Sequence, residues 1–277
     1  MDSVLVTGAS TGIGRATALR LAAAGWRVFA GVRREEDAAA LREAAVGPLQ
    51  PLFLDVTDPG QIEAARERVE ADGAALAGLV NNAGVAIPGP LETLPLEDFR
   101  RQVEINLTGQ VAVTQALLPA VRAGGGRLVF VSSIGGRMAL PLTGAYHAAK
   151  YGIEAVGDVF RQELRPWRIP VSIVEPGSID TPIWERGERA ADEVGSRSPR
   201  QEELYGRTIE RYRAAVRRTA ERGIPPEKVA RTIERALTAR RPRSRYLVGI
   251  DAKVQARLKT VLPTPWMDRL VARAIGL

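Results

Sequence analysis

Tyr146 and Lys150 lie four residues apart in the segment 145–165, which has the length and pattern of a helix. Residues four apart share one helix face, so the lysine can lie beside the phenol. A phenol with a pKa of about 10 becomes a usable acid or base only when a nearby cation stabilises its anion. Lys150 is the only lysine before position 228. The pair therefore predicts proton transfer by a tyrosine.

The composition excludes several other kinds of catalysis. The 277 residues contain no cysteine and one histidine, His147. A thiolate nucleophile, a disulfide, a cysteine zinc site and a site with two imidazoles are therefore excluded, and we expect no metal. His147 directly follows the tyrosine, so on a helix it points away from it, and we expect it to take no part in the chemistry.

A glycine-rich loop lies near the N-terminus. The apolar run 4–6 leads into Thr7-Gly8-Ala9-Ser10-Thr11-Gly12-Ile13-Gly14 and then into a helical segment. In that context glycines let the backbone turn tightly and approach a pyrophosphate, whose charge lies at the helix N-terminus. The alternative is a plain glycine turn, but the position directly after the first strand favours a dinucleotide.

The end of the second predicted strand bears on the choice between NAD and NADP. Domains that bind NAD usually carry an acidic residue about 20 positions after the glycines. Here Val32 stands eighteen residues after Gly14 and is followed by Arg33 and Arg34. A guanidinium can bind a 2′-phosphate through two hydrogen bonds. We expect a preference for NADP, with NAD as the alternative cofactor and a solvated surface arginine as the alternative interpretation of Arg33.

The elements that position these residues alternate along the chain. Short apolar runs without polar alternation predict strands buried on both faces of a parallel sheet; they occupy 4–6, 28–30, 52–54, 79–80, 128–131, 171–174 and 246–248. Helix-length segments such as 15–24, 61–72, 96–122 and 145–165 lie between them. This alternation predicts an α/β fold with a Rossmann-type, doubly wound parallel sheet of seven strands in a single domain, 1–277.

Further motifs follow in order along about two thirds of the chain. They are Leu54-Asp55-Val56, Asn81-Asn82-Ala83-Gly84, Asn106, Ser132-Ser133, Tyr146 with Lys150, and Pro176-Gly177 with Thr181. Together with the glycine loop they resemble the short-chain dehydrogenase/reductase superfamily in its single-domain form. The strings Gly31-Val32-Arg33-Arg34 and Val174-Glu175-Pro176-Gly177 look like the branch that includes retinol and hydroxysteroid dehydrogenases.

The resemblance implies a catalytic set of Asn106, Ser133, Tyr146 and Lys150, with Ser133 favoured over its neighbour by its spacing from the tyrosine. In this family a hydride passes between a nicotinamide and a carbonyl or alcohol carbon, and Tyr146 would exchange the proton on oxygen. Ser133 would bond the substrate oxygen, and Lys150 would bind the ribose and lower the tyrosine pKa. Asn106 would hold a water of the proton relay, or merely cap or bend a helix.

The resemblance also implies the residues that contact the cofactor. The adenine would lie against Asp55 and Val56. The segment 176–179 would pass over the nicotinamide, with Thr181 near its carboxamide. The full set is Gly8, Ser10, Thr11, Gly12, Ile13, Gly14, Arg33, Asp55, Val56, Asn82, Ala83, Gly84, Tyr146, Lys150, Pro176, Gly177, Ile179 and Thr181.

Substrate choice is assigned to a helical lid at 182–225, with a C-terminal helical tail at 251–277. The branch implies a bulky apolar ketone, aldehyde or secondary alcohol, retinoid-like or steroid-like. Candidate pocket walls are Met138, Leu140, Leu142, Trp184 and Tyr205. The alternative is that these residues only pack the lid onto the domain.

The positive charge is concentrated in the last third of the chain. The net charge is +7, but residues 1–180 carry −3 and residues 181–277 carry +10. A solvated helix face would account for Arg207, Arg211, Arg213, Arg217, Arg218 and Arg222. Attraction of an anionic substrate is a second interpretation. The third is contact of the tail with an acidic membrane surface, through Trp266, Met267, Leu270, Val271 and Ile275 beside Arg257, Lys259, Arg269 and Arg273.

Partners and location follow from absences in the sequence. No apolar run reaches eighteen residues and no signal-peptide pattern opens the chain, so we expect a cytoplasmic protein with no transmembrane segment. No nucleic-acid module is present, so we expect no nucleic-acid partner. The family suggests a homodimer or homotetramer by analogy. A non-enzymatic dinucleotide-binding sensor or scaffold on the same fold is the alternative function, and the tyrosine counts against it.

Overall fold

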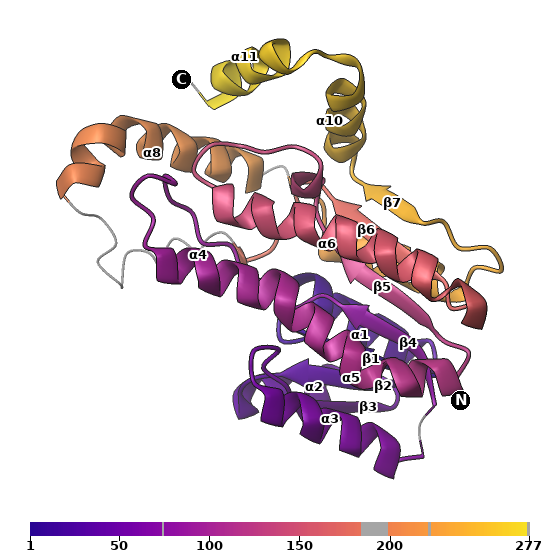
Figure 1. Cartoon of the computed structure of the whole chain (residues 1–277). Helices are drawn as coiled ribbons and strands as arrows, with labels where there is room; N and C mark the ends of the chain where they lie inside the picture. The colour runs from indigo at the N-terminus through magenta and orange to yellow at the C-terminus, as the bar shows by residue number, and fades with distance from the viewer. Residues whose placement is uncertain (74, 184–198, 221–222, 276–277) are drawn as a thin grey trace.

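The structure, a computed structural model, describes residues 1–73, 75–183, 199–220 and 223–275. These ranges form one parallel sheet of seven strands in the order β3-β2-β1-β4-β5-β6-β7, which confirms the predicted fold class (Figure 1). The strands are β1 (Ser3–Val6), β2 (Arg27–Val32), β3 (Leu49–Phe53), β4 (Leu76–Asn81), β5 (Arg127–Val131), β6 (Val171–Pro176) and β7 (Arg245–Val248). The order reverses next to β1, which is where doubly wound sheets open a crevice.

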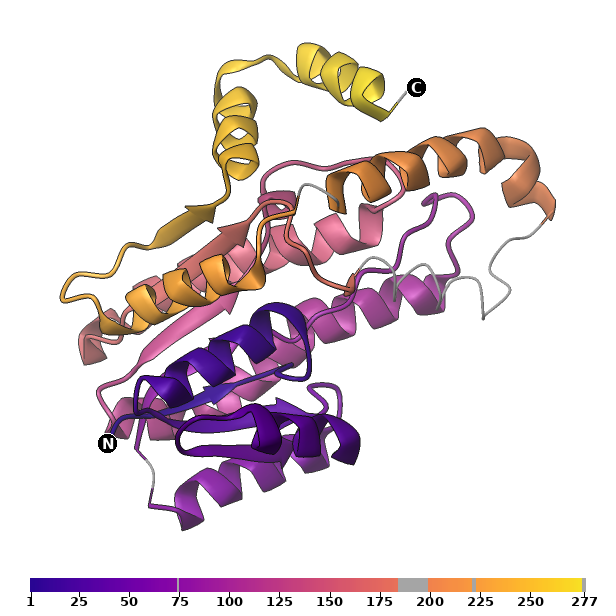
Figure 2. The ribbon, with the colours of Figure 1, turned by 180° about the vertical axis from the view of Figure 1, so that it is seen from behind.

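Helices cover both faces of the sheet and explain why the strands are mainly apolar. One face packs on α1 (Gly12–Ala23), α2 (Glu35–Ala44) and α9 (Pro226–Thr238), and the other on α3 (Pro59–Ala71), α5 (Gly109–Ala123) and α6 (Gly144–Glu163). Figure 1 shows α3, α5 and α6 in front of the sheet, and Figure 2, from behind, shows α1 and α9. Because side chains alternate along a strand, Val4 and Val6 join one core while Leu5 joins the other.

Three helical features differ from the sequence prediction. Helices α2 and α9 were not among the predicted helices, although α2 opens with an acidic first turn and α9 follows Pro225, both typical N-terminal signals. The predicted helix 96–122 is divided into α4 (Leu96–Val103), the π-helical turn η1 (Glu104–Thr108) and α5. The π turn contains Asn106, and such turns often occur at functional sites.

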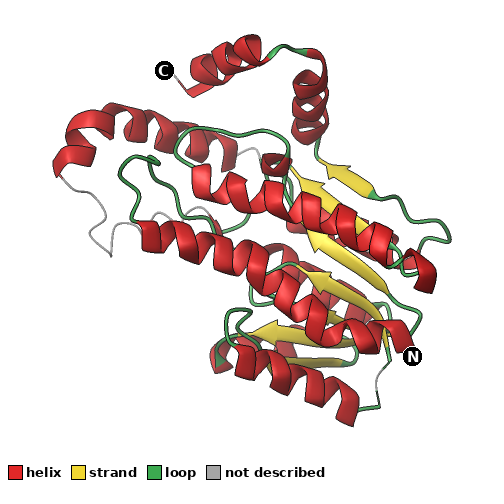
Figure 3. Cartoon of the chain, in the orientation of Figure 1, coloured by secondary structure: helices red, strands yellow, loops and turns green. Residues whose placement is uncertain are grey.

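The C-terminal third adds helices outside the sheet. Helix α8 (Pro199–Ala220) lies at the carboxyl ends of the strands, and α10 (Ile250–Val261) and α11 (Thr264–Ile275) project beyond the β7 edge (Figure 3). Helix α11 contacts α8. Trp184 and Arg222 of the predicted lid lie outside the described residues, as do 184–198 and 221–222 as a whole. Within the described ranges, no helix is long and apolar enough to cross a membrane.

Leu237 tests how much α9 contributes to stability. The side chain is 3% exposed, and its Cδ2 lies 2.7 Å from where a Cβ on Gly78 of β4 would be. Leu237→Ala would leave a cavity that this tight packing cannot refill, so we expect a loss of about 2–5 kcal/mol in the free energy of unfolding, measured in urea. The control is Leu204→Ala on α8, where the leucine is 51% exposed and the expected change is below about 0.5 kcal/mol. Similar losses of stability in the two variants would contradict the importance of the Leu237 packing.

Candidate active site

A cavity of about 410 Å³ opens at the carboxyl ends of the strands, beside the reversal of strand order. Its walls come from the glycine loop, the segments after β2, β3, β4, β5 and β6, and helix α6. Every predicted cofactor-binding residue except Gly14 lines it, and so does Ser133. Asn106 does not line it.

The glycine loop is shaped for close approach of a ligand backbone. Gly8 and Gly12 have positive φ angles of 64° and 54°, which glycine adopts without strain. A Cβ on Gly8 would lie 2.8 Å from Ala83 Cα. A Cβ on Gly14 would lie 2.1 Å from the Gly8 carbonyl oxygen and 2.5 Å from Asn82 Nδ2, so Gly14 packs α1 against the loop from behind. The residues present fit a dinucleotide pyrophosphate at the start of α1.

Hydrogen bonds join the glycine loop to the end of β4. Asn82 Nδ2 donates to the carbonyl oxygens of Thr7 (2.9 Å) and Gly8 (3.1 Å). Thr7 Oγ1 accepts from the backbone N–H groups of Asn82 and Ala83, both at 2.9 Å. These bonds fix the two sides of the crevice relative to each other. Thr7 was not among the predicted site residues, although it stands between the first strand and the first glycine.

The structure brings Ser133, Tyr146 and Lys150 together at this cavity. Tyr146 and Lys150 are one turn apart on α6, and Lys150 Nζ lies 5.8 Å from the tyrosine ring centroid and donates to the Val131 carbonyl oxygen at 2.9 Å. Ser133 follows β5, and its Oγ accepts from the Gly135 N–H at 3.0 Å, which caps the short helix η2 (Ile134–Gly136).

Burial dominates the ionisation of this cluster. Burial raises the pKa of Tyr146 above its usual value, and the hydrogen bond with Ser133 acts in the opposite direction. Burial lowers the pKa of Lys150 to about 8, against the attraction of the Glu154 carboxylate. The phenol is therefore protonated at neutral pH and the lysine is mostly charged. The resemblance implies that Lys150 lowers the tyrosine pKa, whereas in the structure burial has the largest effect on the phenol and raises its pKa.

Asn106 and Gln102 hold one wall of the cavity. Asn106 is fully buried, and its amide accepts from the Val85 N–H and donates to the Val85 carbonyl oxygen, both at 2.8 Å. Gln102, one turn earlier, accepts from the Ile87 N–H at 2.7 Å and also donates to the Val85 carbonyl oxygen at 2.8 Å. The Asn106 amide is thus engaged with backbone. Gln102 was missed, although two amide side chains four residues apart were visible in the sequence.

Buried ion pairs lie behind helix α6. Glu175, at the end of β6, is fully buried, and its carboxylate is held by Arg137 (2.7 and 2.8 Å) and by Arg245 (3.2 Å). Arg245 also binds Glu154 at 3.0 Å. Burial, then the charge of Glu175, raises the pKa of Glu154, while Ser132 and Arg245 act against this. The cluster ties the loop after Ser133 to the strand that precedes Pro176.

The His147 imidazole is held by contacts with two neighbouring segments. Its Nδ1 donates to the Gly135 carbonyl oxygen at 2.8 Å, and its Nε2 lies 2.9 Å from Thr143 Oγ1. Burial lowers the pKa of the imidazole. These contacts tie the loop after Ser133 to the start of α6. Within the described part of the chain, no group of three His, Cys, Asp or Glu residues is placed to hold a metal ion.

The predicted substrate walls that the structure describes do not line this cavity. Of the five, Trp184 is outside the described residues, and Met138, Leu140, Leu142 and Tyr205 do not line this cavity. The Tyr205 hydroxyl instead donates to Glu92 at 2.6 Å. The apolar residues that do line it include Val85, Ala86, Ile87, Pro182 and Ile183.

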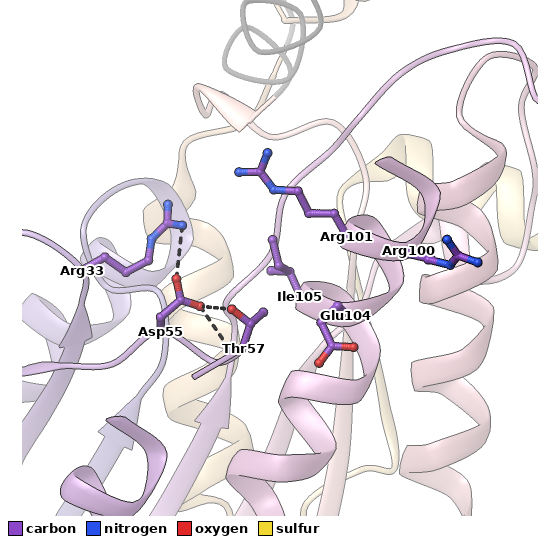
Figure 4. Close-up of a pocket in the computed structure, with 7 residues that line it drawn as sticks. All are labelled: Arg33, Asp55, Thr57, Arg100, Arg101, Glu104 and Ile105. Carbon is purple, nitrogen blue, oxygen red and sulfur yellow. Dashed lines mark hydrogen bonds and ion pairs between the residues drawn. The ribbon is translucent and has the colours of Figure 1, made fainter. Parts of the chain in front are cut away.

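An arginine-lined pocket of about 410 Å³ adjoins the cavity and shares Arg33, Asp55, Arg101 and Ile105 with it (Figure 4). Arg33 Nη1 lies 3.7 Å from Asp55 Oδ2. Burial opposes ionisation of Asp55, but two hydrogen bonds from Thr57 and the Arg33 charge hold the pKa of Asp55 below its usual value. Figure 4 shows Arg101 extending toward the side of Arg33 and Arg100 extending away.

Arg101 was not predicted from the sequence. It makes no ion pair with any residue in the described ranges, so its charge is available on the wall that faces Arg33. The sequence offered only the pair Arg100-Arg101 on a surface helix, a pattern that does not show which arginine faces the cavity.

The buried lysine should reduce stability at neutral pH. The pKa of Lys150 falls from 10.5 to about 8 on folding, so between these values the unfolded chain binds more protons and the folded protein gains stability as pH rises. We expect Lys150→Met to be more stable than the wild type by on the order of 2 kcal/mol near pH 7, with the difference shrinking near pH 10, in urea unfolding. Lys228→Met, at an exposed position of α9, should leave the free energy of unfolding unchanged at both pH values. A destabilised Lys150→Met protein at both pH values would disprove this.

Comparison with known proteins agrees with the geometry of the site. The family model described as short chain dehydrogenase matches residues 2–192. Human retinol dehydrogenase 5 is 37% identical over 97% of this chain and 87% of its own length. An NADPH-dependent 3-dehydrocapnine reductase of Ornithobacterium rhinotracheale is 32% identical over 98% of this chain and 96% of its own.

The fold comparison points the same way. The crystal structure of a short chain dehydrogenase from Burkholderia cenocepacia, in complex with NADP, superposes with a TM-score of 0.74 at 27% identity, covering 97% of each chain. The chain therefore belongs to the short-chain dehydrogenase/reductase family of nicotinamide-dependent oxidoreductases and is retinol dehydrogenase-like.

Proposed function

We propose that this protein is an NADP-dependent oxidoreductase that interconverts a bulky apolar ketone or aldehyde and the corresponding alcohol. The observation that carries this proposal is the meeting of Ser133, Tyr146 and Lys150 in the cavity that the glycine loop also lines. Val85, Ile87 and Ile183 line the same cavity and favour an apolar substrate over a charged one.

The residues divide the chemistry between them. The bound nicotinamide would supply or accept the hydride. The hydroxyls of Ser133 and Tyr146 would hydrogen-bond the substrate oxygen, and the protonated Tyr146 would donate its proton to that oxygen during reduction. The Lys150 ammonium would stabilise the phenolate left behind. Asn106 and Gln102 would position the Val85 wall, so we assign Asn106 a positioning role and no direct contact through its amide.

NADP preference rests on the arginines at the far end of the cavity. Arg33 and Arg101 approach the cavity from different elements, and two guanidinium groups suit a 2′-phosphate between them. Asp55, a carboxylate on the same wall, is paired with Arg33 and held by Thr57. The NADPH-dependent relative and the NADP complex in the family support the same preference.

We infer that the segment 182–225 is the substrate lid. Pro182 and Ile183 line the cavity, and the Ile224 N–H donates to the Ser178 carbonyl oxygen at 3.0 Å where the segment returns to the body. Between them, α8 is joined to the loop before α4 by Arg200 and Tyr205, which both contact Glu92. The residues 251–277 form the tail beyond it.

Tyr146→Phe tests the assigned chemistry. Removal of the phenol hydroxyl removes the proton donor, so we expect kcat to fall by about 10²–10⁴-fold in NADPH oxidation with a panel of apolar aldehydes and ketones. The binding of NADPH, followed by fluorescence, should stay within about threefold. Full activity in the variant would refute the mechanism, and NADPH binding without turnover by the wild type on any substrate would favour the sensor alternative.

Arg33→Ala and Arg101→Ala test the cofactor preference. Loss of one charge-assisted contact should lower kcat/KM for NADPH by about 10-fold or more and change kcat/KM for NADH by less than about threefold. Arg100→Ala is the matched control, because Arg100 lines the adjoining pocket but not the cavity and extends away from Arg33, so its removal should change kcat/KM for neither cofactor. A wild-type kcat/KM that favours NADH would disprove the preference, and equal effects of the Arg100 and Arg101 variants would disprove the role of Arg101.

A further inference from the structure

We propose that helices α10 and α11 dock the protein on a membrane surface that is rich in anionic lipid. The docking surface, here named the tail face, consists of exposed apolar and basic side chains. Its members are Ile250, Lys253, Val254, Arg257 and Val261 of α10, and Trp266, Arg269, Leu270 and Arg273 of α11.

On α10 the tail face follows from helical periodicity. Starting at Ile250, the spacing i, i+4, i+7 and i+11 runs along one side of the helix and reaches Val261. Ala252 and Ala256 lie on the opposite side and are 0% and 7% exposed. The helix therefore packs on the body through small residues and turns its larger apolar residues outward.

Helix α11 repeats the arrangement. Trp266, Leu270 and Arg273 follow the spacing i, i+4 and i+7, while Met267 faces inward at 5% exposed. The Arg269 guanidinium lies 5.5 Å from the Trp266 ring centroid. Both helices thus present the same combination of apolar and basic side chains on their outer sides.

The apolar members are highly exposed. The exposed fractions are 81% for Ile250, 51% for Val254, 62% for Val261, 59% for Trp266 and 43% for Leu270. Insertion of such side chains into the boundary between headgroups and acyl chains removes apolar surface from water, and tryptophan is favoured at that depth.

The charges select lipid as the occupant. The tail face carries four cations and no carboxylate. Of the aspartates on these helices, Asp251 faces the body and accepts from the Ser178 N–H at 2.6 Å. Asp268 lies about half a turn from Trp266, on the opposite side of α11. A second copy of the chain, related by two-fold symmetry, would bring four cations against the same four cations, and like charges oppose such an interface. An anionic lipid surface neutralises them.

The position of the tail joins this surface to the active site. Helices α10 and α11 project beyond the body in both views (Figures 1 and 2). The first turn of α10 is tied to the cavity, because Asp251 holds the Ser178 N–H and a Cβ on Gly177 would lie 2.3 Å from Asp251 Oδ2. Helix α11 contacts α8 of the lid. Docking would therefore place the lid side of an enzyme for apolar substrates next to the lipid.

The test is flotation of the full-length protein with vesicles of phosphatidylcholine alone or mixed with phosphatidylserine, at low and high salt. We expect wild-type protein to float with the anionic vesicles, to remain in solution with the neutral ones, and to be released by salt. The double variant R269Q/R273Q should lower the partition coefficient by about 30-fold, because each basic residue adds a roughly fivefold contribution near an anionic surface. The variant W266S/L270S should lower it at unchanged charge.

Matched controls separate docking from general charge. R217Q/R218Q removes two exposed arginines of α8, and W167S removes a tryptophan that is 52% exposed outside the tail; both should float like the wild type. Absence of flotation with anionic vesicles, or equal loss in R217Q/R218Q and R269Q/R273Q, would overturn the proposal. A tail variant that changes the mass in solution while wild-type protein ignores vesicles would show a subunit contact instead, and would also overturn it.

Discussion

The site depends on keeping one ammonium group charged while it is buried. Lys150 is 4% exposed, and desolvation pulls its pKa down to about 8. What keeps it charged is the Val131 carbonyl oxygen at 2.9 Å and the Glu154 carboxylate one turn along α6. Glu154 can supply that charge only if it stays ionised, and burial beside Glu175 works against this. Arg245, which binds both carboxylates, therefore favours the charged form of Lys150 by keeping Glu154 ionised.

Buried backbone groups, like the buried ammonium, need polar partners, and this explains why side chains hold the loops around the cavity. At the carboxyl ends of parallel strands the backbone leaves the sheet, and its N–H and C=O groups need new partners. Thr7 and Asn82 supply them between the glycine loop and β4, and Gln102 and Asn106 supply them for the segment after β4. Each of these side chains fixes backbone that lines the cavity. A site built in this way is preorganised without regular secondary structure at the point of contact.

Sequence reasoning succeeded where the physical signal is local. The strands were recognised because a residue buried on both faces of a sheet leaves a continuous apolar run, and the glycine loop because turn, strand and helix are adjacent in the chain. It failed where the signal is a contact between distant segments. Nothing local shows that Gln102 bonds Ile87, that Arg137 meets Glu175, or that Arg101 faces Arg33 across a cavity. The π turn at Asn106 was hidden for the same reason, since its sequence reads as an unbroken helix.

The basic residues in the last third of the chain have two different environments: some are paired with carboxylates inside the protein, and others lie exposed on the tail. Arg245 belongs to this third by position, yet its charge is consumed inside the protein by Glu154, Glu175 and Asp158. The arginines of α11 carry the same formal charge and, within the described residues, make no ion pair. Near β7, the net charge therefore overstates the positive charge that is available to a partner. Along the tail, it describes that charge correctly. The α11 arginines are hydrated, so they can give up water for contact with an anionic surface. Arg245 could not do so without leaving a buried carboxylate unpaired.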